Sequence, residues 1–301
     1  MLATEILKGQ GIGNQLFCYI TVRSLSYDRG LEFGIKDLSG WAGSYTDLVN
    51  DYNSNGFYWF DLEMGAIVPN QMNVYYEKDV RIKMPTCQHD MTHGCDVRGF
   101  DEGVVNAPDD TIIMGNLQDE RYFLHNKSII KEWLKVKSEF DTYEFSNDNL
   151  CILNFRGGPY VGFYELFLSR EYWIKAMDNM LSLNPKIKFI IITDDVKTAN
   201  QMFPEIPAYH FDVARDYSII KNSRHVILSN SSFAYFPVFT SDTIETIIAP
   251  KYWGRHNVSD GYWASEQNLY SGWLYQDREG NLESYEDCHQ QLQQYKKNLQ
   301  Q

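Results

Sequence analysis

The stretch Cys151-Ile-Leu-Asn-Phe-Arg156-Gly-Gly-Pro-Tyr160-Val-Gly-Phe-Tyr-Glu165 predicts a buried strand that ends in a sharp turn. Its apolar start is typical of a strand inside a parallel sheet, and the Gly-Gly-Pro of residues 157–159 cannot continue that strand. An arginine therefore follows the C-terminal end of a strand, where open α/β folds bind their ligands. The planar, permanently charged guanidinium of Arg156 suits a phosphate or a diphosphate. Arg156 is thus the first catalytic candidate, and a surface arginine in a local ion pair is the alternative.

A similar pattern of strand, polar turn and helix opens the chain. Residues 2–7 predict a strand, a glycine-rich loop follows at residues 9–14, and residues 16–28 have apolar positions at helical spacing. Unpaired NH groups at a helix start favour an anion, so Gly11, Gly13 and Asn14 are candidate donor-binding residues. A dinucleotide fingerprint is the alternative, although its third glycine would be one position early. In that case Asp37 would be the ribose-binding acid.

The alternation of predicted strands and helices continues along the rest of the chain. Strands are predicted at residues 111–114, 189–192, 226–228 and 247–248, and helices at 128–137, 170–183, 196–203 and 217–221. This alternation predicts an α/β fold with two Rossmann-like lobes and a ligand cleft between them. The polar segment 141–149 has the composition of a linker, so we expect an N-terminal lobe at 1–145 and a C-terminal lobe at 146–301.

Composition and charge narrow the possible classes of function. The 301 residues are 44% hydrophobic, which is enough for a substantial core. The net charge of −13 argues against nucleic acid as a partner, because that affinity comes mainly from cations on phosphates. Five scattered cysteines and the absence of a secretory signal or a membrane-spanning apolar run predict a soluble, cytoplasmic protein with reduced thiols. The oligomeric state stays open.

Residues 38–110 are harder to interpret, and we expect irregular connections and short helices there. Within them lies Cys87-x-His89-x3-His93-x-Cys95, whose four side chains are all possible zinc ligands. The spacing differs from the usual zinc-binding patterns, so we favour an incidental cluster and predict no metal.

Five short motifs occur in one order along the chain. They are Gly9-Gln-Gly-Ile-Gly-Asn-Gln-Leu-Phe17, the segment 115–123, Thr193-Asp-Asp195, Ser229-Asn-Ser-Ser-Phe233 and Ile248-Ala-Pro-Lys251. In order and spacing they resemble glycosyltransferase family 11, the GDP-fucose-dependent α-1,2-fucosyltransferases, and more distantly the α-1,6 and protein O-fucosyltransferases. The resemblance covers residues 9 to about 253.

The chain departs from that family at its opening stretch. The family's H-x-R-R-G-D-Y is similar to Asn154-Phe-Arg156-Gly-Gly-Pro-Tyr160, in which only the first arginine survives. Asn154, Gly157 and Pro159 replace the histidine, the second arginine and the aspartate. The loss of a cation makes the donor sugar less certain than the class of reaction.

The resemblance implies a GT-B-like fold and an inverting, metal-independent transfer of L-fucose from GDP-fucose to a hydroxyl of a glycan acceptor, with no cofactor besides the donor. Arg156 would stabilise the departing diphosphate, and Glu165 is a candidate base whose alternative is a solvated surface carboxylate. Of the Asp194–Asp195 pair, one would face Arg156 while the other caps a helix, and Asp212 or Asp216 would accept from guanine unless both are exposed. The predicted donor-binding residues are Gly11, Gly13, Asn14, Asn154, Asp194, Asp195, Asp212, Asp216, Ser231, Ser232 and Phe233.

Two other classes of protein remain as alternatives. A non-catalytic carbohydrate-binding homologue would explain the altered arginine motif at residues 156–160. A nicotinamide-dependent oxidoreductase would explain the glycine loop at residues 9–13.

Overall fold

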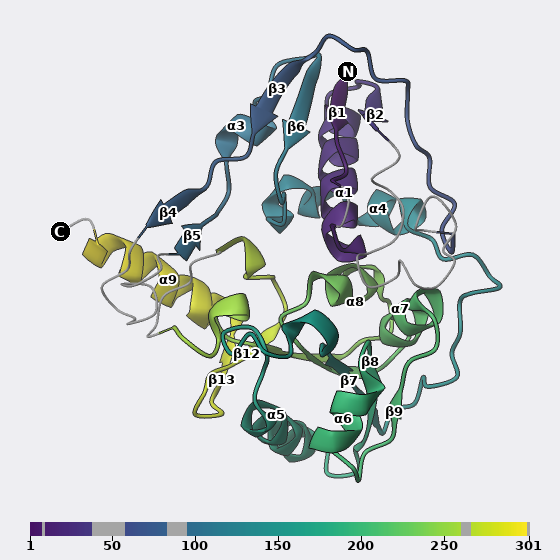
Figure 1. Cartoon of the computed structure of the whole chain (residues 1–301), viewed down its shortest axis with the longest axis vertical. Coiled ribbons are helices and arrows are strands. Elements are labelled where there is room, and N and C mark those ends of the chain that lie inside the picture. Colours follow the sequence, from purple (N-terminus) through teal and green to yellow (C-terminus); the bar gives the residue numbers. More distant parts are fainter. Residues whose placement is uncertain (8–9, 38–57, 83–94, 260–265, 300–301) are drawn as a thin grey trace.

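The strands of this protein form two separate, mainly parallel sheets, one in each half of the chain. The computed structural model describes residues 1–7, 10–37, 58–82, 95–259 and 266–299, and Figure 1 shows the first lobe above the second. An antiparallel pair, β4 (Val80–Ile82) with β5 (Cys95–Val97), lies beside the first lobe. The predicted α/β class with two lobes is therefore confirmed. The division at residue 145 stays a prediction.

The first lobe is built on four parallel strands in the order β2-β1-β6-β3. Residues of β1 and β6 are almost fully buried, so these two inner strands form the centre of the lobe's core. Helix α1 packs against β1 and β2. We expected irregular structure at β3, but its backbone pairs in parallel with β6 although its side chains are mainly exposed. The elements of this lobe are β1 (Leu2–Thr4), α1 (Ile12–Asp28), β2 (Phe33–Ile35), β3 (Asn73–Tyr76), α3 (Glu102–Val105), β6 (Thr111–Met114) and α4 (Lys127–Trp133).

The second lobe holds a seven-stranded sheet in the order β13-β12-β11-β10-β7-β8-β9. All its pairs are parallel except β12 with β13, and the three central strands are the apolar runs predicted from the sequence. Its elements are β7 (Leu150–Phe155), α5 (Arg170–Leu183), β8 (Lys188–Thr193), α6 (Val196–Met202), β9 (Ala208–Tyr209), α7 (Val213–Lys221), β10 (His225–Leu228), α8 (Tyr235–Thr240), β11 (Thr246–Pro250), β12 (Leu274–Gln276), β13 (Leu282–Ser284) and α9 (Tyr285–Leu299).

Helices cover both faces of this second sheet, as a doubly wound fold requires. Cys151, Leu153 and Phe155 of β7 belong to a core cluster with α5 and α6, whereas Ile152 belongs to a cluster with α7 and α8. Figure 1 shows α7 and α8 between the sheet and the first lobe. Because side chains alternate along a strand, the residues after β7 that share the face of Ile152 point toward the first lobe.

One hydrophobic cluster runs across the junction of the lobes. The ring of Phe17 on α1 lies 4.7 Å from that of Tyr235 and 4.9 Å from that of Phe236, both on α8. At the start of α1, a Cβ placed on Gly13 would stand 2.4 Å from the carbonyl carbon of Ser232. The first turn of α1 is therefore packed directly on a turn of the second lobe, and the glycine makes this approach possible.

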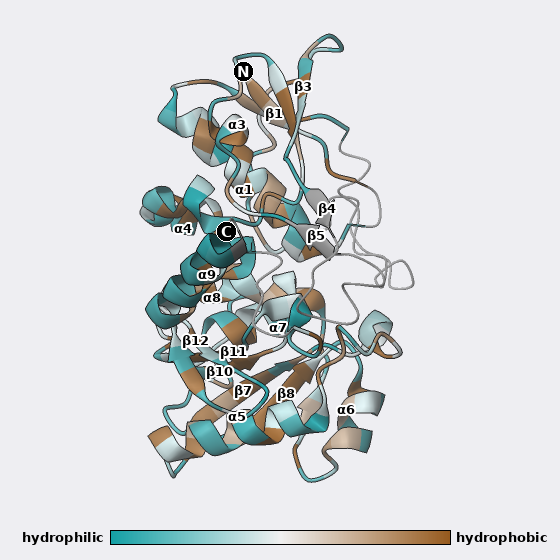
Figure 2. Ribbon diagram, turned by 90° about the vertical axis from the view of Figure 1, so that its left-hand side faces the viewer, coloured by the Kyte–Doolittle hydropathy of each residue, from teal (hydrophilic) through white to brown (hydrophobic). Residues whose placement is uncertain are grey.

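The sequence placed the starts of α1 and α7 too late, α7 beginning at Val213 rather than at residue 217, and missed the last elements. Helix α1 begins at Ile12, so Gly13 and Asn14 form its first turn rather than a preceding loop. Strands β12 and β13 and helix α9 extend the second lobe beyond the predicted strand at 247–248. Figure 2 shows α9 as a largely hydrophilic helix on the outside of the molecule, while β7 and β8 are hydrophobic and interior.

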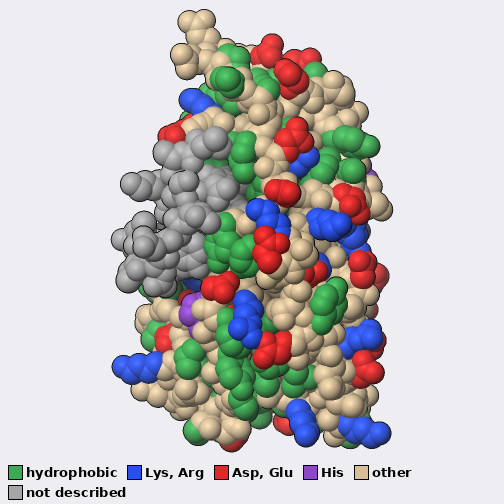
Figure 3. Space-filling model, turned by 90° about the vertical axis from the view of Figure 1, so that its right-hand side faces the viewer, with side chains coloured by type: hydrophobic (Ala, Val, Ile, Leu, Met, Phe, Trp, Pro, Cys, Tyr) green, Lys and Arg blue, Asp and Glu red, His purple; other side chains and the backbone are tan. Residues whose placement is uncertain are grey.

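The surface carries charges of both signs. On the face shown in Figure 3, lysine and arginine side chains alternate with aspartate and glutamate, and small apolar groups lie between them. Among the described helices, none combines the length and the apolar character that crossing a membrane would need.

Candidate functional site

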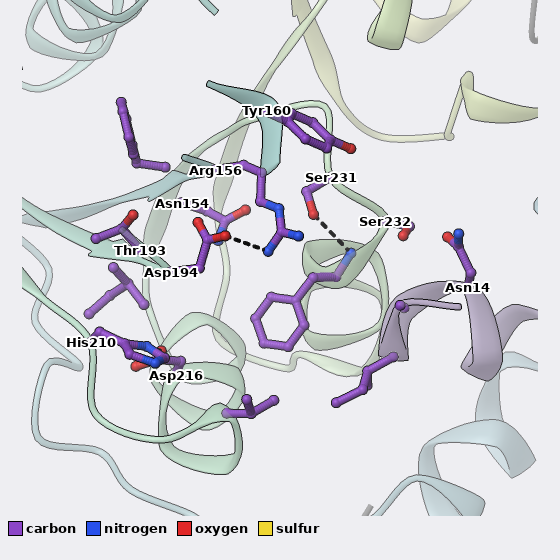
Figure 4. Close-up of a pocket in the computed structure, with 17 residues that line it drawn as sticks. Asn14, Asn154, Arg156, Tyr160, Thr193, Asp194, His210, Asp216, Ser231 and Ser232 are labelled. Atoms are coloured by element: carbon purple, nitrogen blue, oxygen red, sulfur yellow. Dashed lines mark hydrogen bonds and ion pairs between the residues drawn. The ribbon is translucent and has the colours of Figure 1, made fainter. Parts of the chain in front are cut away.

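A pocket of about 440 Å³ opens where the two lobes meet. The C-terminal ends of β7, β8 and β10 supply one side of it, and the first turn of α1 supplies the other (Figure 4). The strand ends lie level because Phe155 pairs with Thr193 and Asn154 pairs with Leu228 in the sheet. The lining residues are Gly11, Ile12, Gly13, Asn14, Asn154, Phe155, Arg156, Tyr160, Ile192, Thr193, Asp194, His210, Val213, Asp216, Ser231, Ser232 and Phe233.

Arg156 points into this pocket from the end of β7 (Figure 4). Its Nη1 lies 2.7 Å from Oδ2 of Asp194, and its guanidinium carbon lies 5.5 Å from the centre of the Tyr160 ring. Contact with Asp194 is an ion pair rather than an aligned hydrogen bond, since Oδ2 has no hydrogen-bond donor among the described residues. The buried Nε of Arg156 likewise lacks an acceptor there. The guanidinium thus keeps hydrogen-bonding capacity for a ligand.

The turn after Arg156 is shaped by the two aspartates that follow β8. Gly157 N donates to Oδ1 of Asp194 at 2.9 Å, and Gly158 N donates to Oδ2 of Asp195 at 3.3 Å. A Cβ on Gly157 would stand 2.6 Å from the Cβ of Asp195, and Gly158 has φ of +44°. This backbone excludes a larger side chain at position 157, which is a physical reason for glycine where the resembling family has a second arginine.

Two helical starts face the pocket, and the first of them has unpaired NH groups. Gly11 caps α1 without any side-chain hydrogen bond, and the first turn of α1 contains no acidic residue. Opposite it, Ser231 caps a short 3₁₀ turn, and its Oγ accepts from Phe233 N at 3.4 Å. Free NH groups and the helix dipole at the start of the 17-residue α1 favour negative charge. The pocket therefore offers an anion one cation and NH donors from both lobes.

Asn14 is held in place by a chain of side-chain amides. Its Oδ1 accepts from Gln118 Nε2 at 2.8 Å, and Gln118 Oε1 accepts from Asn268 Nδ2 at 2.9 Å. This assignment directs the Nδ2 group of Asn14 away from Gln118, and no acceptor for Nδ2 occurs in the described part of the chain. Asn14 thus lines the pocket as a fixed donor.

His210 and Asp216 form the opposite end of the pocket, near the start of α7 (Figure 4). His210 Nδ1 lies 2.7 Å from Oδ2 of Asp216, and Phe211 N donates to Oδ1 at 3.2 Å. Burial raises the pKa of Asp216, while the contact with His210 opposes that shift. Sequence reasoning proposed Asp216 but missed His210 and Tyr160, because a histidine after a two-residue strand gives no motif.

Three predicted site residues do not line the pocket. Asp195 caps α6, accepting from Thr198 N at 3.0 Å; burial alone would raise its pKa, but hydrogen bonds from Thr198 and Gly158 lower it below its usual range. Asp212 caps α7 and is exposed. Glu165 lies half-buried in the loop before α5. The capping alternative thus describes Asp195, and the exposure alternative describes Asp212. Asp37, which follows β2, does not line this pocket.

The remaining sequence candidates fall elsewhere. Cys87, His89 and His93 lie outside the described residues, so the zinc alternative for them stays open. Within the described residues there is no cluster of three or more possible metal ligands. Cys18, Cys151 and Cys288 are buried free thiols.

The sequence matches no protein-family model and no curated protein. Solved structures with a similar course of the chain include POFUT1 in complex with GDP, with 8% identity and a TM-score of 0.44 over 82% of this chain and 97% of that one. POFUT1 in complex with GDP-fucose gives 8% identity and 0.44 over 82% and 96%. NodZ alpha-1,6-fucosyltransferase soaked with GDP-fucose gives 15% identity and 0.47 over 86% and 97%.

At these levels of similarity, function has to be argued from the residues of this chain. Together the fold and the pocket define a two-lobed α/β protein with a pocket between the lobes, lined by one arginine and by the first turn of α1.

Proposed function

We propose that this protein is an inverting, metal-independent glycosyltransferase that moves a sugar, L-fucose from GDP-fucose, to a hydroxyl of a glycan acceptor. One observation carries the proposal. Residues from three of the resembling motifs, which are far apart in the sequence, line a single pocket: Gly11 to Asn14, Asp194, and Ser231 to Phe233, together with Arg156. A volume of about 440 Å³ lies within the range of small-molecule and cofactor sites.

The geometry supports a role in the binding and departure of a diphosphate. In the proposed reaction the acceptor oxygen forms a bond to the anomeric carbon as the bond from that carbon to the diphosphate oxygen breaks. Negative charge then grows on the leaving GDP, where Arg156 and the NH groups of α1 and of the 231–233 turn would stabilise it. Asp194 Oδ2 lies 2.7 Å from Arg156 Nη1, so we assign Asp194 the role of orienting this arginine and not the role of a base.

The proton of the acceptor hydroxyl needs a destination. Glu165 does not line the pocket. In an inverting displacement the acceptor and the diphosphate lie on opposite faces of the sugar. We therefore propose that the proton passes to water on the acceptor side, while the diphosphate leaves as an anion. Replacing Glu165 with glutamine should then leave the rate of transfer within about threefold of the wild-type rate, since this carboxylate takes no part.

The nucleoside would occupy the end of the pocket formed by His210 and Asp216. Both carboxylate oxygens of Asp216 already accept hydrogen bonds, one from His210 and one from Phe211 N, and further lone pairs remain for the donors on a guanine edge. Asp212, the other carboxylate expected from the sequence, is exposed and caps α7, which favours Asp216 for this role.

The acceptor would approach past the turn that follows Arg156. Three and four residues after Tyr160 in the sequence, the side chains of Phe163 and Tyr164 are 59% and 63% exposed, which is high for large aromatic groups. Such rings can stack on the apolar faces of sugars while their edges remain in water. We propose them as the platform for the acceptor glycan.

Incubation with GDP-fucose, GDP-mannose and UDP-sugars, with and without glycan acceptors, tests the proposal. We expect release of GDP and a labelled product from GDP-fucose, and a large loss of rate in Arg156→Ala. Arg170→Ala is a matched control, because Arg170 is a surface arginine on α5 that pairs with Glu205. No turnover of any GDP-sugar, together with no thermal shift from GDP, would contradict the proposal.

A non-catalytic glycan-binding protein is the second candidate. The observation that favours it is the ion pair of Arg156 with Asp194, which lowers the net positive charge available to a diphosphate. It predicts glycan binding with no release of GDP from any donor. Detectable transfer excludes it.

A further inference from the structure

A second cavity, of about 390 Å³, lies in the first lobe. It opens to solvent and is lined by the C-terminal half of α1, the start of β2, the segment 63–66 and the end of α4. Arg23 lines it and stands ten residues after Gly13 on α1, which corresponds to about 15 Å along the helix. This cavity, here called the Arg23 cavity, is therefore separate from the pocket between the lobes. Its polar and aromatic lining residues are Arg23, Ser26, Tyr27, Glu32, Phe33, Glu63 and Trp133.

Aromatic rings and a flat cation form its wall. The guanidinium carbon of Arg23 lies 4.3 Å from the centre of the Trp133 ring and 5.1 Å from that of Phe33. Tyr27 meets Trp133 edge to face at 5.7 Å, yet its side chain is 58% exposed. The wall is thus rigid, and Tyr27 extends it toward solvent.

Its polar groups are fixed in place or lack partners. Arg23 is only 11% exposed, and its Nη2 donates to Oε2 of Glu63 at 2.7 Å. Ser26 is 1% exposed and lines the cavity, and its Oγ has no hydrogen-bond partner among the described residues. A buried hydroxyl without a partner is costly and uncommon. It is a place where a ligand could complete a hydrogen bond.

The chemistry of this lining selects among classes of ligand. Glu63 and the exposed Glu32 oppose a phosphate or a carboxylate, and Arg23 already occupies the aromatic faces that an ammonium group would need. A neutral, polyhydroxylated ring satisfies every group present. Its apolar face can lie on the exposed ring of Tyr27, and its hydroxyls can bond Ser26, Glu63 and the guanidinium.

We propose that the Arg23 cavity is a saccharide-binding site that accepts a neutral mono- or disaccharide. It does not depend on the function proposed for the pocket between the lobes. If both sites act on one glycan, binding at the cavity raises the effective concentration of that glycan at the pocket.

Saturation-transfer NMR with L-fucose, D-galactose and lactose, in the presence of excess GDP, tests this proposal. We expect a saturation-transfer signal from at least one of these sugars, and this signal should fall at least fivefold in Tyr27→Ala. Tyr76→Ala is the matched control, because Tyr76 is a 70% exposed tyrosine of the same lobe outside the cavity. The part of the signal that Tyr27→Ala removes should persist in Arg156→Ala.

A second variant separates loss of the site from loss of the fold. Ser26→Ala removes the hydroxyl without a partner, so its unfolding midpoint should equal or exceed that of the wild type while saccharide binding weakens. No signal from any of the three sugars would overturn the proposal. A saturation-transfer signal that persists in both Tyr27→Ala and Ser26→Ala would overturn the proposal as well. So would a signal that Arg156→Ala abolishes.

Discussion

Replacing Gly13 with alanine should separate the two lobes at the pocket. The new Cβ would stand 2.4 Å from the carbonyl carbon of Ser232, 2.5 Å from its oxygen and 2.6 Å from Phe233 N. All three are backbone atoms, so no side chain can rotate to make room. Because carbon atoms pack at about 3.5–4.0 Å, α1 and the 231–233 turn would have to move apart by about 1 Å.

The expected cost follows from overpacking, which typically destabilises a protein by about 1–3 kcal/mol. Gly13→Ala should therefore lower the free energy of unfolding in urea by about 2 kcal/mol. It should also weaken GDP binding about tenfold or more, since both displaced segments line the pocket and about 1.4 kcal/mol corresponds to tenfold.

Gly11→Ala provides the matched control in the same loop. A Cβ on Gly11 has no atom within 4 Å, and its φ of −63° suits alanine. The loss of a favourable helix cap and the lower entropy of the unfolded chain oppose each other there, so the net change should stay within about 0.5 kcal/mol. Equal stability and equal GDP affinity in the two variants would refute the proposed contact between the lobes.

Three further changes test the electrostatics. Asp194→Asn keeps an acceptor for Gly157 N but removes the negative charge beside Arg156. Calorimetry should then show GDP binding several-fold more tightly than to the wild type. Weaker binding would contradict the proposal that Arg156 binds the diphosphate. Burial lowers the pKa of His256 from 6.5 to about 4, so stability is lost as pH falls through this range. In urea titrations, the wild type should lose about 3 kcal/mol of unfolding free energy relative to His256→Gln between pH 7 and pH 4. Burial raises the pKa of Glu120, so the stability contributed by the protonated carboxyl is present near pH 4 and is lost as pH rises. Thermal unfolding should therefore show Glu120→Gln gaining stability relative to the wild type from pH 4.5 to pH 7. A constant difference in unfolding temperature between the two proteins would argue against this burial effect.

The fold was predictable where the hydrophobic period was clear. The strand at 111–114 and the helix at 170–183 were predicted to the residue, because each is an unbroken pattern with a definite end. The start of α1 was predicted too late, since Ile12-Gly13-Asn14 has the composition of a loop. Its helical state depends on contact with Ser232, which no local pattern can show.

The candidate site was predictable to the extent that parallel strands align their ends. Asn154, Arg156, Asp194 and Ser231 meet in the pocket because their strands are neighbours in one sheet. Sequence alone could not decide between Asp194 and its neighbour as the partner of Arg156, because the choice depends on strand register and on which face each side chain takes. The roles of these residues in binding and catalysis stay predictions.

Calorimetric titration of GDP into the wild type and into Arg156→Ala tests the central claim most directly, because it measures a nucleoside diphosphate in the pocket between the lobes. The account predicts one GDP bound per chain by the wild type and affinity at least tenfold weaker in the variant, about 1.4 kcal/mol or more. Failure of the wild type to bind GDP, or equal affinity in the two proteins, would contradict it.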